Sequence, residues 1–151
     1  MTVACIRHTG IVVSRMEKSL RFYRDLLGME VWEDFEGSGP FIESLTAVPG
    51  ARIWMIKLRS KQGGSIELLQ YLNCPQEVPP RVRACDVGCN HVALEVDDID
   101  MLHGKLCKEG IEFHAPPAAS PTGRFKVAYC RDPEGVMLEL VEVLAMPANG
   151  G

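Results

Sequence analysis

The sequence predicts an α+β fold made of two βαβββ modules in tandem, and two observations support this. A strand with a histidine at its entry occurs twice, at His8 and at His91, and in each copy apolar residues alternate along the strand. Residues 52–71 also align with residues 124–143 without a gap. Internal copies of this kind indicate a repeated supersecondary unit.

Each of the two aligned segments places a glutamate in an otherwise apolar strand. These residues are Glu67 in the first copy and Glu139 in the second. Each module therefore carries one early histidine and one late glutamate. Because side chains alternate across a strand, the histidines point away from the apolar face. The common register predicts that both histidines face one shared concavity.

The first module, at residues 5–72, begins with an expected strand at 5–13. Ser14 stands three residues before Glu17, which is a capping box and predicts the start of a helix. Gly28 is expected to end that helix in the left-handed conformation. The remaining expected elements are strands at residues 29–35, 51–58 and 65–72.

Residues 36–50 are additional material in the first copy, rich in glycine and proline. The composition predicts a loop with a short helix in its middle. A long segment over a cavity is often a lid or a specificity loop, and a plain surface insertion remains the alternative. Residues 73–88 form the predicted linker, in which prolines disfavour a helix.

The second module, at residues 89–144, is expected to repeat the order of the first. Asp97 with Asp100 three residues later predicts the start of a helix that ends at Gly110. The expected strands are residues 90–96, 111–114, 124–131 and 136–144. A proline-rich loop is predicted at 115–123 and a frayed tail at 147–151.

Composition excludes several classes of function. The chain has 151 residues, 46% of them apolar, and a net charge of −4 without a block of like charges, so we expect no nucleic-acid partner. We expect no membrane partner, since no apolar run is long enough to span one. The N-terminus does not resemble a signal peptide, and the six cysteines contain no Cys-x-x-Cys pair, so we expect reduced thiols and a cytoplasmic location.

Several stretches resemble the vicinal oxygen chelate superfamily, the glyoxalase/bleomycin-resistance/dioxygenase group. They are His8 with Gly10-Ile11-Val12-Val13, the run Glu17-Lys18-Ser19-Leu20-x-Phe22-Tyr23-x-Asp25-x-Leu27-Gly28-Met29, Ile66-Glu67-Leu68, Asn90-His91-Val92-Ala93, and Asp132-Pro133-Glu134-Gly135 through Leu140. The resemblance implies a glyoxalase-like fold whose curved mixed sheets surround a metal cavity. It also implies a homodimer.

The same resemblance implies a set of metal ligands and a chemistry. The implied ligands are those of bacterial-type glyoxalase I: His8, Glu67, His91 and Glu139. They suit a divalent nickel, cobalt, zinc, manganese or iron ion. The implied catalytic base is Glu139 or Glu67. Weaker candidates for substrate contacts are Arg124, Lys126 and Glu43.

These residues predict a metal-dependent lyase or isomerase of glyoxalase type that moves a proton next to a metal-bound carbonyl. It would be similar to lactoylglutathione lyases or to acyl-CoA epimerases, with a small-molecule substrate. After the fourth-strand glutamate the chain has Leu69-Gln70-Tyr71-Leu72 in place of the Asn-Trp-Gly of glyoxalase I. The alternatives are an Fe(II) extradiol-type dioxygenase and a metal-free small-molecule-binding or resistance protein.

Overall fold

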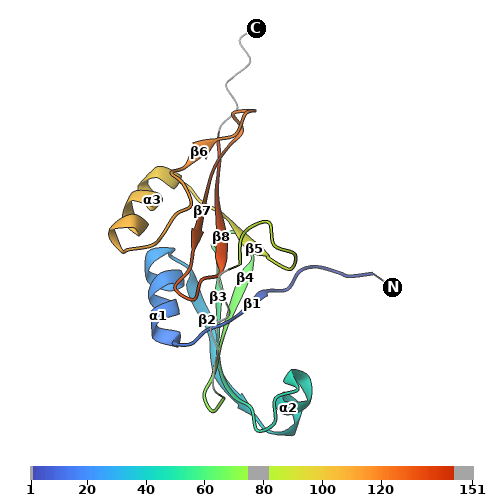
Figure 1. Ribbon diagram of the computed structural model, residues 1–151. Helices are drawn as coiled ribbons and strands as arrows, with labels where there is room; N and C mark the ends of the chain where they lie inside the picture. The colour runs from blue at the N-terminus through green and yellow to red at the C-terminus, as the bar shows by residue number, and fades with distance from the viewer. Residues whose placement is uncertain (1, 75–81, 145–151) are drawn as a thin grey trace. The chain divides into compact units, whose positions relative to one another are not determined.

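The computed structural model describes residues 2–74 and 82–144, which divide into two compact units, Met1–Pro79 and Pro80–Gly151. Each unit holds one four-stranded mixed sheet and one helical segment after its first strand (Figure 1). This agrees with the predicted α+β fold of two βαβββ modules. Among the described helices, none is long and apolar enough to cross a membrane.

The sheet of the first unit has the strand order β1-β4-β3-β2. β1 runs parallel to β4, whereas the β4–β3 and β3–β2 pairs are antiparallel. The strands are β1 (Thr9–Val12), β2 (Glu30–Ser38), β3 (Arg52–Arg59) and β4 (Ser65–Tyr71). The helices are α1 (Met16–Leu20), its continuation as a π-helix, η1 (Arg21–Leu26), and α2 (Pro40–Thr46).

The sheet of the second unit repeats this arrangement, with the order β5-β8-β7-β6. β5 runs parallel to β8, and the other two pairs are antiparallel. Its elements are β5 (His91–Glu95), α3 (Ile99–Lys108), β6 (Ala118–Ala119), β7 (Phe125–Arg131) and β8 (Met137–Val143).

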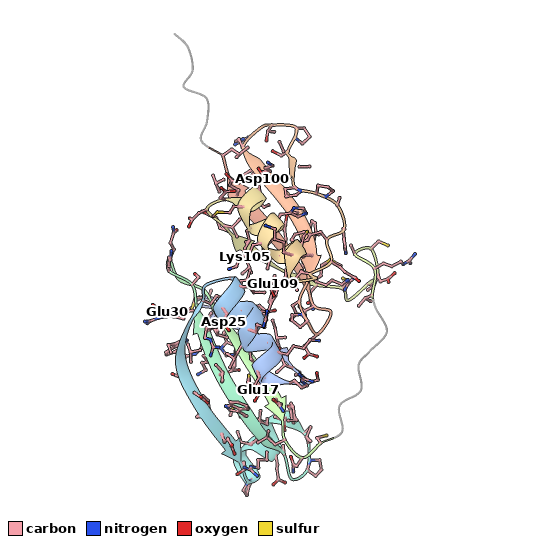
Figure 2. All side chains as sticks on the ribbon, turned by 90° about the vertical axis from the view of Figure 1, so that its left-hand side faces the viewer. Glu17, Asp25, Glu30, Asp100, Lys105 and Glu109 are labelled. Carbon is pink, nitrogen blue, oxygen red and sulfur yellow. The ribbon has the colours of Figure 1, made fainter. Side chains whose placement is uncertain are left out.

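One face of each sheet is covered by the helix of its own unit. In the first unit, Ile56, Leu58 and Leu68 are buried, as are Phe22 and Tyr23 of η1. The charged side chains of the helices, such as Glu17 and Asp100, lie on the outer surface (Figure 2). Because strand side chains alternate, the helix-covered face takes the apolar residues and leaves the histidines and glutamates to the other face.

Both helices begin with a contact that the sequence reading missed. The Met16 amide donates a hydrogen bond to Gln70 Oε1 (2.7 Å), and the Ile99 amide donates one to Glu142 Oε2 (3.0 Å). Gln70 and Glu142 occupy the same position in the two copies, near the end of β4 and β8. In each unit the last strand therefore satisfies a helical amide that has no partner within its helix.

The N-caps of α1 and α3 each lie one residue after the predicted position. Arg15, and not Ser14, is the N-cap of α1, and its side chain makes no capping hydrogen bond. In the second unit Asp98, one residue after the predicted Asp97, is the cap, and its side chain accepts a hydrogen bond from the Met101 amide. The predicted stop at Gly28 is confirmed by its positive φ of 73°.

Several boundaries also differ from the sequence-based expectation. β1 begins at Thr9 rather than residue 5, because its pairing with β4 starts only at Thr9↔Ile66. Of the predicted strand 111–114, only a single bridge of Phe113 to Cys130 forms, and the neighbour of β7 is instead β6, inside the predicted loop 115–123. The short helix expected within 36–50 is α2. The middle of the predicted linker and the predicted tail lie outside the described residues.

Candidate metal centre

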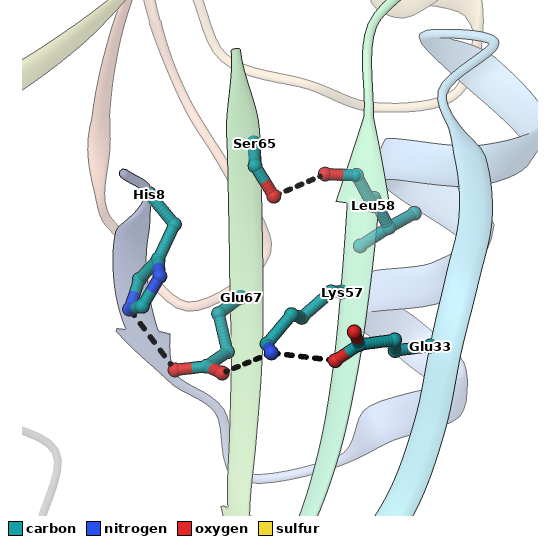
Figure 3. A network of polar contacts seen from close by, with 6 residues as sticks. All are labelled: His8, Glu33, Lys57, Leu58, Ser65 and Glu67. Atoms are coloured by element: carbon teal, nitrogen blue, oxygen red, sulfur yellow. Dashed lines mark hydrogen bonds and ion pairs between the residues drawn. The ribbon is translucent and has the colours of Figure 1, made fainter. Parts of the chain in front are cut away.

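Parallel pairing brings the first histidine to the first glutamate. In the register of β1 and β4, Gly10 lies opposite Glu67, and His8 precedes Gly10 by two residues on the same face. His8 Nε2 lies 3.3 Å from Glu67 Oε2 (Figure 3). The His8 side chain is partly exposed, whereas that of Glu67 is 13% exposed.

The second unit makes the same arrangement with its own residues. Ala93 lies opposite Glu139 in the register of β5 and β8, and His91 again precedes the paired residue by two positions. His91 Nε2 lies 3.0 Å from Glu139 Oε2. The duplicated sequence pattern thus becomes a duplicated pair of neighbouring imidazole and carboxylate groups.

The spacing within each pair fits two ligands of one metal ion. Two donor atoms bound to one ion at about 2.1 Å lie roughly 3.0–3.4 Å apart for octahedral to tetrahedral angles. The measured separations of 3.3 and 3.0 Å match that range. Imidazole with carboxylate is a donor set that suits borderline divalent metals. Within residues 2–74 and 82–144, no three such donors gather, so each unit presents two.

The surroundings of the two glutamates differ in charge. In the first unit Lys57 lies opposite Glu67 across the β3–β4 pair, with Nζ 3.9 Å from Glu67 Oε1. The same ammonium group donates a hydrogen bond of 2.5 Å to Glu33 Oε2 on β2 (Figure 3). The Lys57 side chain is only 13% exposed. The first pair therefore belongs to a network that runs from His8 through Glu67 and Lys57 to Glu33.

In the second unit the corresponding neighbour is a phenol. Tyr129 lies opposite Glu139 across the β7–β8 pair. Burial raises the pKa of Tyr129 above its usual 10.0, and the charge of Glu139 and a hydrogen bond to it raise that pKa further. The ring packs edge-on against His91 at 5.4 Å and stacks with His114 at 6.2 Å. Glu139 thus has a neutral hydroxyl group where Glu67 has a cation.

The sequence reading missed Lys57 and Tyr129, although the internal alignment contained the signal. When residues 52–71 are placed on 124–143, Lys57 falls on Tyr129. The antiparallel register then sets each of them directly across from the glutamate of its own copy. A residue that faces a candidate ligand and differs between copies is a sign of different roles for the two copies.

The weaker sequence candidates lie apart from the two pairs. Lys126 contacts Asp100 on α3 through its ammonium group, and strand alternation places it on the face of β7 opposite to Tyr129. Arg124 is exposed, just before β7 begins. Glu43 lies in the first turn of α2, in the segment that follows β2. In the part of the chain that the structure describes, none of these three residues forms a hydrogen bond or an ion pair with the His–Glu pairs.

A family model and two curated relatives of this chain all belong to glyoxalase-type proteins. The family model described as Glyoxalase/Bleomycin resistance protein/Dioxygenase superfamily matches residues 6–140. A lactoylglutathione lyase of Schizosaccharomyces pombe is 28% identical over an alignment of 151 positions, which covers 93% of this chain and 48% of that protein. A probable lactoylglutathione lyase of Synechocystis sp. is 27% identical over 89% of this chain and 92% of its own length. The chain thus spans about half the length of the yeast relative.

Solved structures show the same fold. A glyoxalase family protein from Bacillus cereus superposes with a TM-score of 0.87 at 21% identity, covering 96% of this chain and 97% of that one. An antibiotic binding protein from Streptomyces sp. CB03234 superposes with a TM-score of 0.63 at 20% identity, covering 95% and 99%. With the family model matching most of the sequence and the tandem βαβββ fold in agreement, the chain belongs to the Glyoxalase/Bleomycin resistance protein/Dioxygenase superfamily.

Proposed function

We propose that His8, Glu67, His91 and Glu139 are the protein ligands of a divalent metal, and that the chain catalyses proton transfer next to a carbonyl of a small oxygenated substrate. The observation that supports this most is the duplication of a His–Glu pair at ligand spacing. A single pair at 3.0–3.3 Å is equally compatible with a hydrogen bond. Two pairs in identical strand registers, on the sheet faces turned away from α1 and α3, are better explained by one common ligand chemistry.

A metal bound by these residues would stabilise the negative charge that develops on a substrate carbonyl oxygen when the neighbouring carbon loses its proton. Glu67 and Glu139 have different neighbours, and we assign them different tasks. Lys57 and Glu33 hold Glu67 in an ion-pair network, which favours a carboxylate that stays in place as a ligand. Glu139 is therefore the proposed base.

Tyr129 supports the proposed task of Glu139. Its raised pKa keeps the phenol protonated at neutral pH, so its hydroxyl donates a hydrogen bond to the Glu139 carboxylate. The hydrogen bond orients the carboxylate without adding a positive charge beside it. A base must lie within hydrogen-bond reach of the proton that it accepts, and an oriented carboxylate meets that requirement.

The test combines metal analysis with proton exchange. Purified wild-type protein should contain one divalent ion per chain, and His8→Ala and His91→Ala should each reduce that content. The metal-loaded enzyme should speed the exchange of the α-protons of 2-hydroxyacetophenone in D2O, followed by NMR. Glu139→Gln should lose the exchange far more completely than it loses metal. Full metal content in both histidine variants would refute the assignment of the ligands.

The relatives named lactoylglutathione lyase make the glutathione hemithioacetal of methylglyoxal the second substrate to assay. A metal-free binding protein is the alternative function, favoured by the exposed rings of Trp32 and Phe35 on β2. The antibiotic binding protein of the same fold belongs to that class. Binding of an aromatic compound with the same affinity before and after chelation of metal would favour this alternative.

A further inference from the structure

The basic side chains on the strands of the first sheet are all paired with carboxylates of β2. β1, β2 and β4 contain no lysine or arginine, and β3 contains Arg52, Lys57 and Arg59. Their nitrogens lie 2.8, 2.5 and 3.1 Å from carboxylate oxygens of Glu36, Glu33 and Glu30, respectively. The strands of this sheet therefore neutralise their own positive charge.

This pairing disfavours a substrate with a carboxylate-rich tail. A carboxylate that approached β3 would meet cations whose charge is already offset by glutamates of β2, and those glutamates would repel it. The Lys57–Glu33 pair, with a Lys57 side chain 13% exposed, is the best shielded of the three. The strands of the first unit thus offer poor recognition of a peptide such as glutathione.

Two aromatic rings instead approach the network around Glu67. Lys57 Nζ lies 5.5 Å from the centre of the Trp32 ring and 5.4 Å from that of Phe35. Both residues are exposed, at 43% and 40%. The same Nζ atom lies 3.9 Å from Glu67. Lys57 therefore contacts both aromatic rings and the proposed metal ligand Glu67.

A β-bulge explains how both rings reach the same ammonium group. Residues 32 and 35 would lie on opposite faces of a regular strand, since side chains alternate. The pairing of β2 with β3 shifts between Val31 and Glu33, so Trp32 is the extra residue of a bulge. A bulge changes the direction of a side chain, and the residues after it lie on the opposite faces to those they would occupy in a regular strand. Phe35, across from Met55, then shares its face with Glu33 and Lys57.

We infer that Trp32 and Phe35 form an aromatic platform that binds an uncharged aromatic ring of the substrate, next to the oxygens that the metal would hold. This inference rests on the proposed function and narrows its substrate class to aryl-substituted carbonyl compounds. Exposed aromatic faces favour offset or edge-to-face contact with another ring. Next to the platform, Met55 and Ile53 continue the same face of β3 and are buried under Ile42 of α2.

The test compares two chelators on the metal-loaded protein by calorimetry. Benzohydroxamate and acetohydroxamate present the same pair of oxygens to a metal and differ in the phenyl ring. Benzohydroxamate should bind about 10-fold more tightly, the effect of one favourable ring contact together with its burial. Trp32→Leu and Phe35→Leu should each lower this preference at least about threefold, leaving acetohydroxamate affinity and metal content unchanged. S-methylglutathione should not displace benzohydroxamate.

Trp54→Phe is the matched control, because the Trp54 indole donates to Asp34 (2.7 Å) on the opposite face of the β2–β3 pair. Its phenyl preference should equal that of wild type. If wild type shows no preference for benzohydroxamate, or if the preference survives both leucine substitutions, the aromatic platform is refuted and the proposed metal site is not. If neither hydroxamate binds the protein after metal loading, the proposed metal chemistry fails and the platform inference falls with it. Both substituted positions are exposed, and far-UV circular dichroism checks that the variants fold.

Discussion

The substitution Glu67→Gln separates a ligand role of this side chain from a purely structural one. In the metal-free protein, glutamine keeps the shape of the side chain and an acceptor for His8 Nε2. The change removes an attraction to Lys57 at 3.9 Å, and the ammonium group keeps its 2.5 Å contact with Glu33. Both side chains are 13% exposed, but Lys57 keeps its nearer partner Glu33, so the substitution leaves no unpaired ammonium group. The metal-free free energy of unfolding should therefore fall by about 1–2 kcal/mol.

The metal-loaded protein should respond much more strongly. Loss of an outer-shell partner of a ligand costs about 10–100-fold in metal affinity, so loss of a charged ligand should cost at least about 100-fold. At a free metal concentration of about 100 times the wild-type dissociation constant, binding adds about 2.7 kcal/mol to wild-type stability. A variant with about 100-fold weaker affinity gains only about 0.4 kcal/mol at the same concentration. The difference of roughly 2.3 kcal/mol is the expected signal.

Urea unfolding with and without metal measures this difference directly. Glu36→Gln is the control, because it makes the same chemical change at a carboxylate that pairs with exposed Arg52 on β3. Its metal-dependent stabilisation should equal that of wild type. Equal stabilisation of Glu67→Gln and wild type by metal would refute the assignment of Glu67 as a ligand.

Three further predictions concern the scaffold. Glu142→Ala removes the acceptor of the Ile99 amide and should lower the free energy of unfolding by about 1 kcal/mol, measured in urea. Gly37→Ala should destabilise by no more than about 1 kcal/mol, because its Cβ would come within 2.8 Å of the Met55 methyl group, which is the flexible end of that side chain. Gly104→Ala, which has open space in α3, should stabilise slightly. Burial raises the pKa of the Cys130 thiol from 9.0 to about 12. Between these pH values the folded protein keeps a proton that the unfolded chain releases. The free energy of unfolding should therefore fall by up to about 1.4 kcal/mol per pH unit as the pH rises through this range. Cys130→Ala should remove most of that slope in unfolding measured across the same pH range.

Much of the fold could be predicted because its signals are local or repeated. The alternation of apolar residues around Ile11 and Leu94 predicted strands, and the ungapped internal alignment predicted their duplication. The helix stop at Gly28 followed from the conformational freedom of glycine. The helix starts were predicted less well, because the first amide of each helix donates to a residue of a distant strand, Gln70 or Glu142.

The sequence by itself determined that each copy carries a histidine and a glutamate on the face opposite to its alternating apolar residues, because a period of two fixes the face of every residue in a strand. Only the tertiary structure decided what stands beside each glutamate. Pairing of β3 with β4 sets Lys57 across from Glu67, and pairing of β7 with β8 sets Tyr129 across from Glu139. The bulge at Trp32 likewise exists only when β2 is paired with β3. Periodicity in a chain specifies a face, whereas neighbours across strands are specified by register, which forms only on folding.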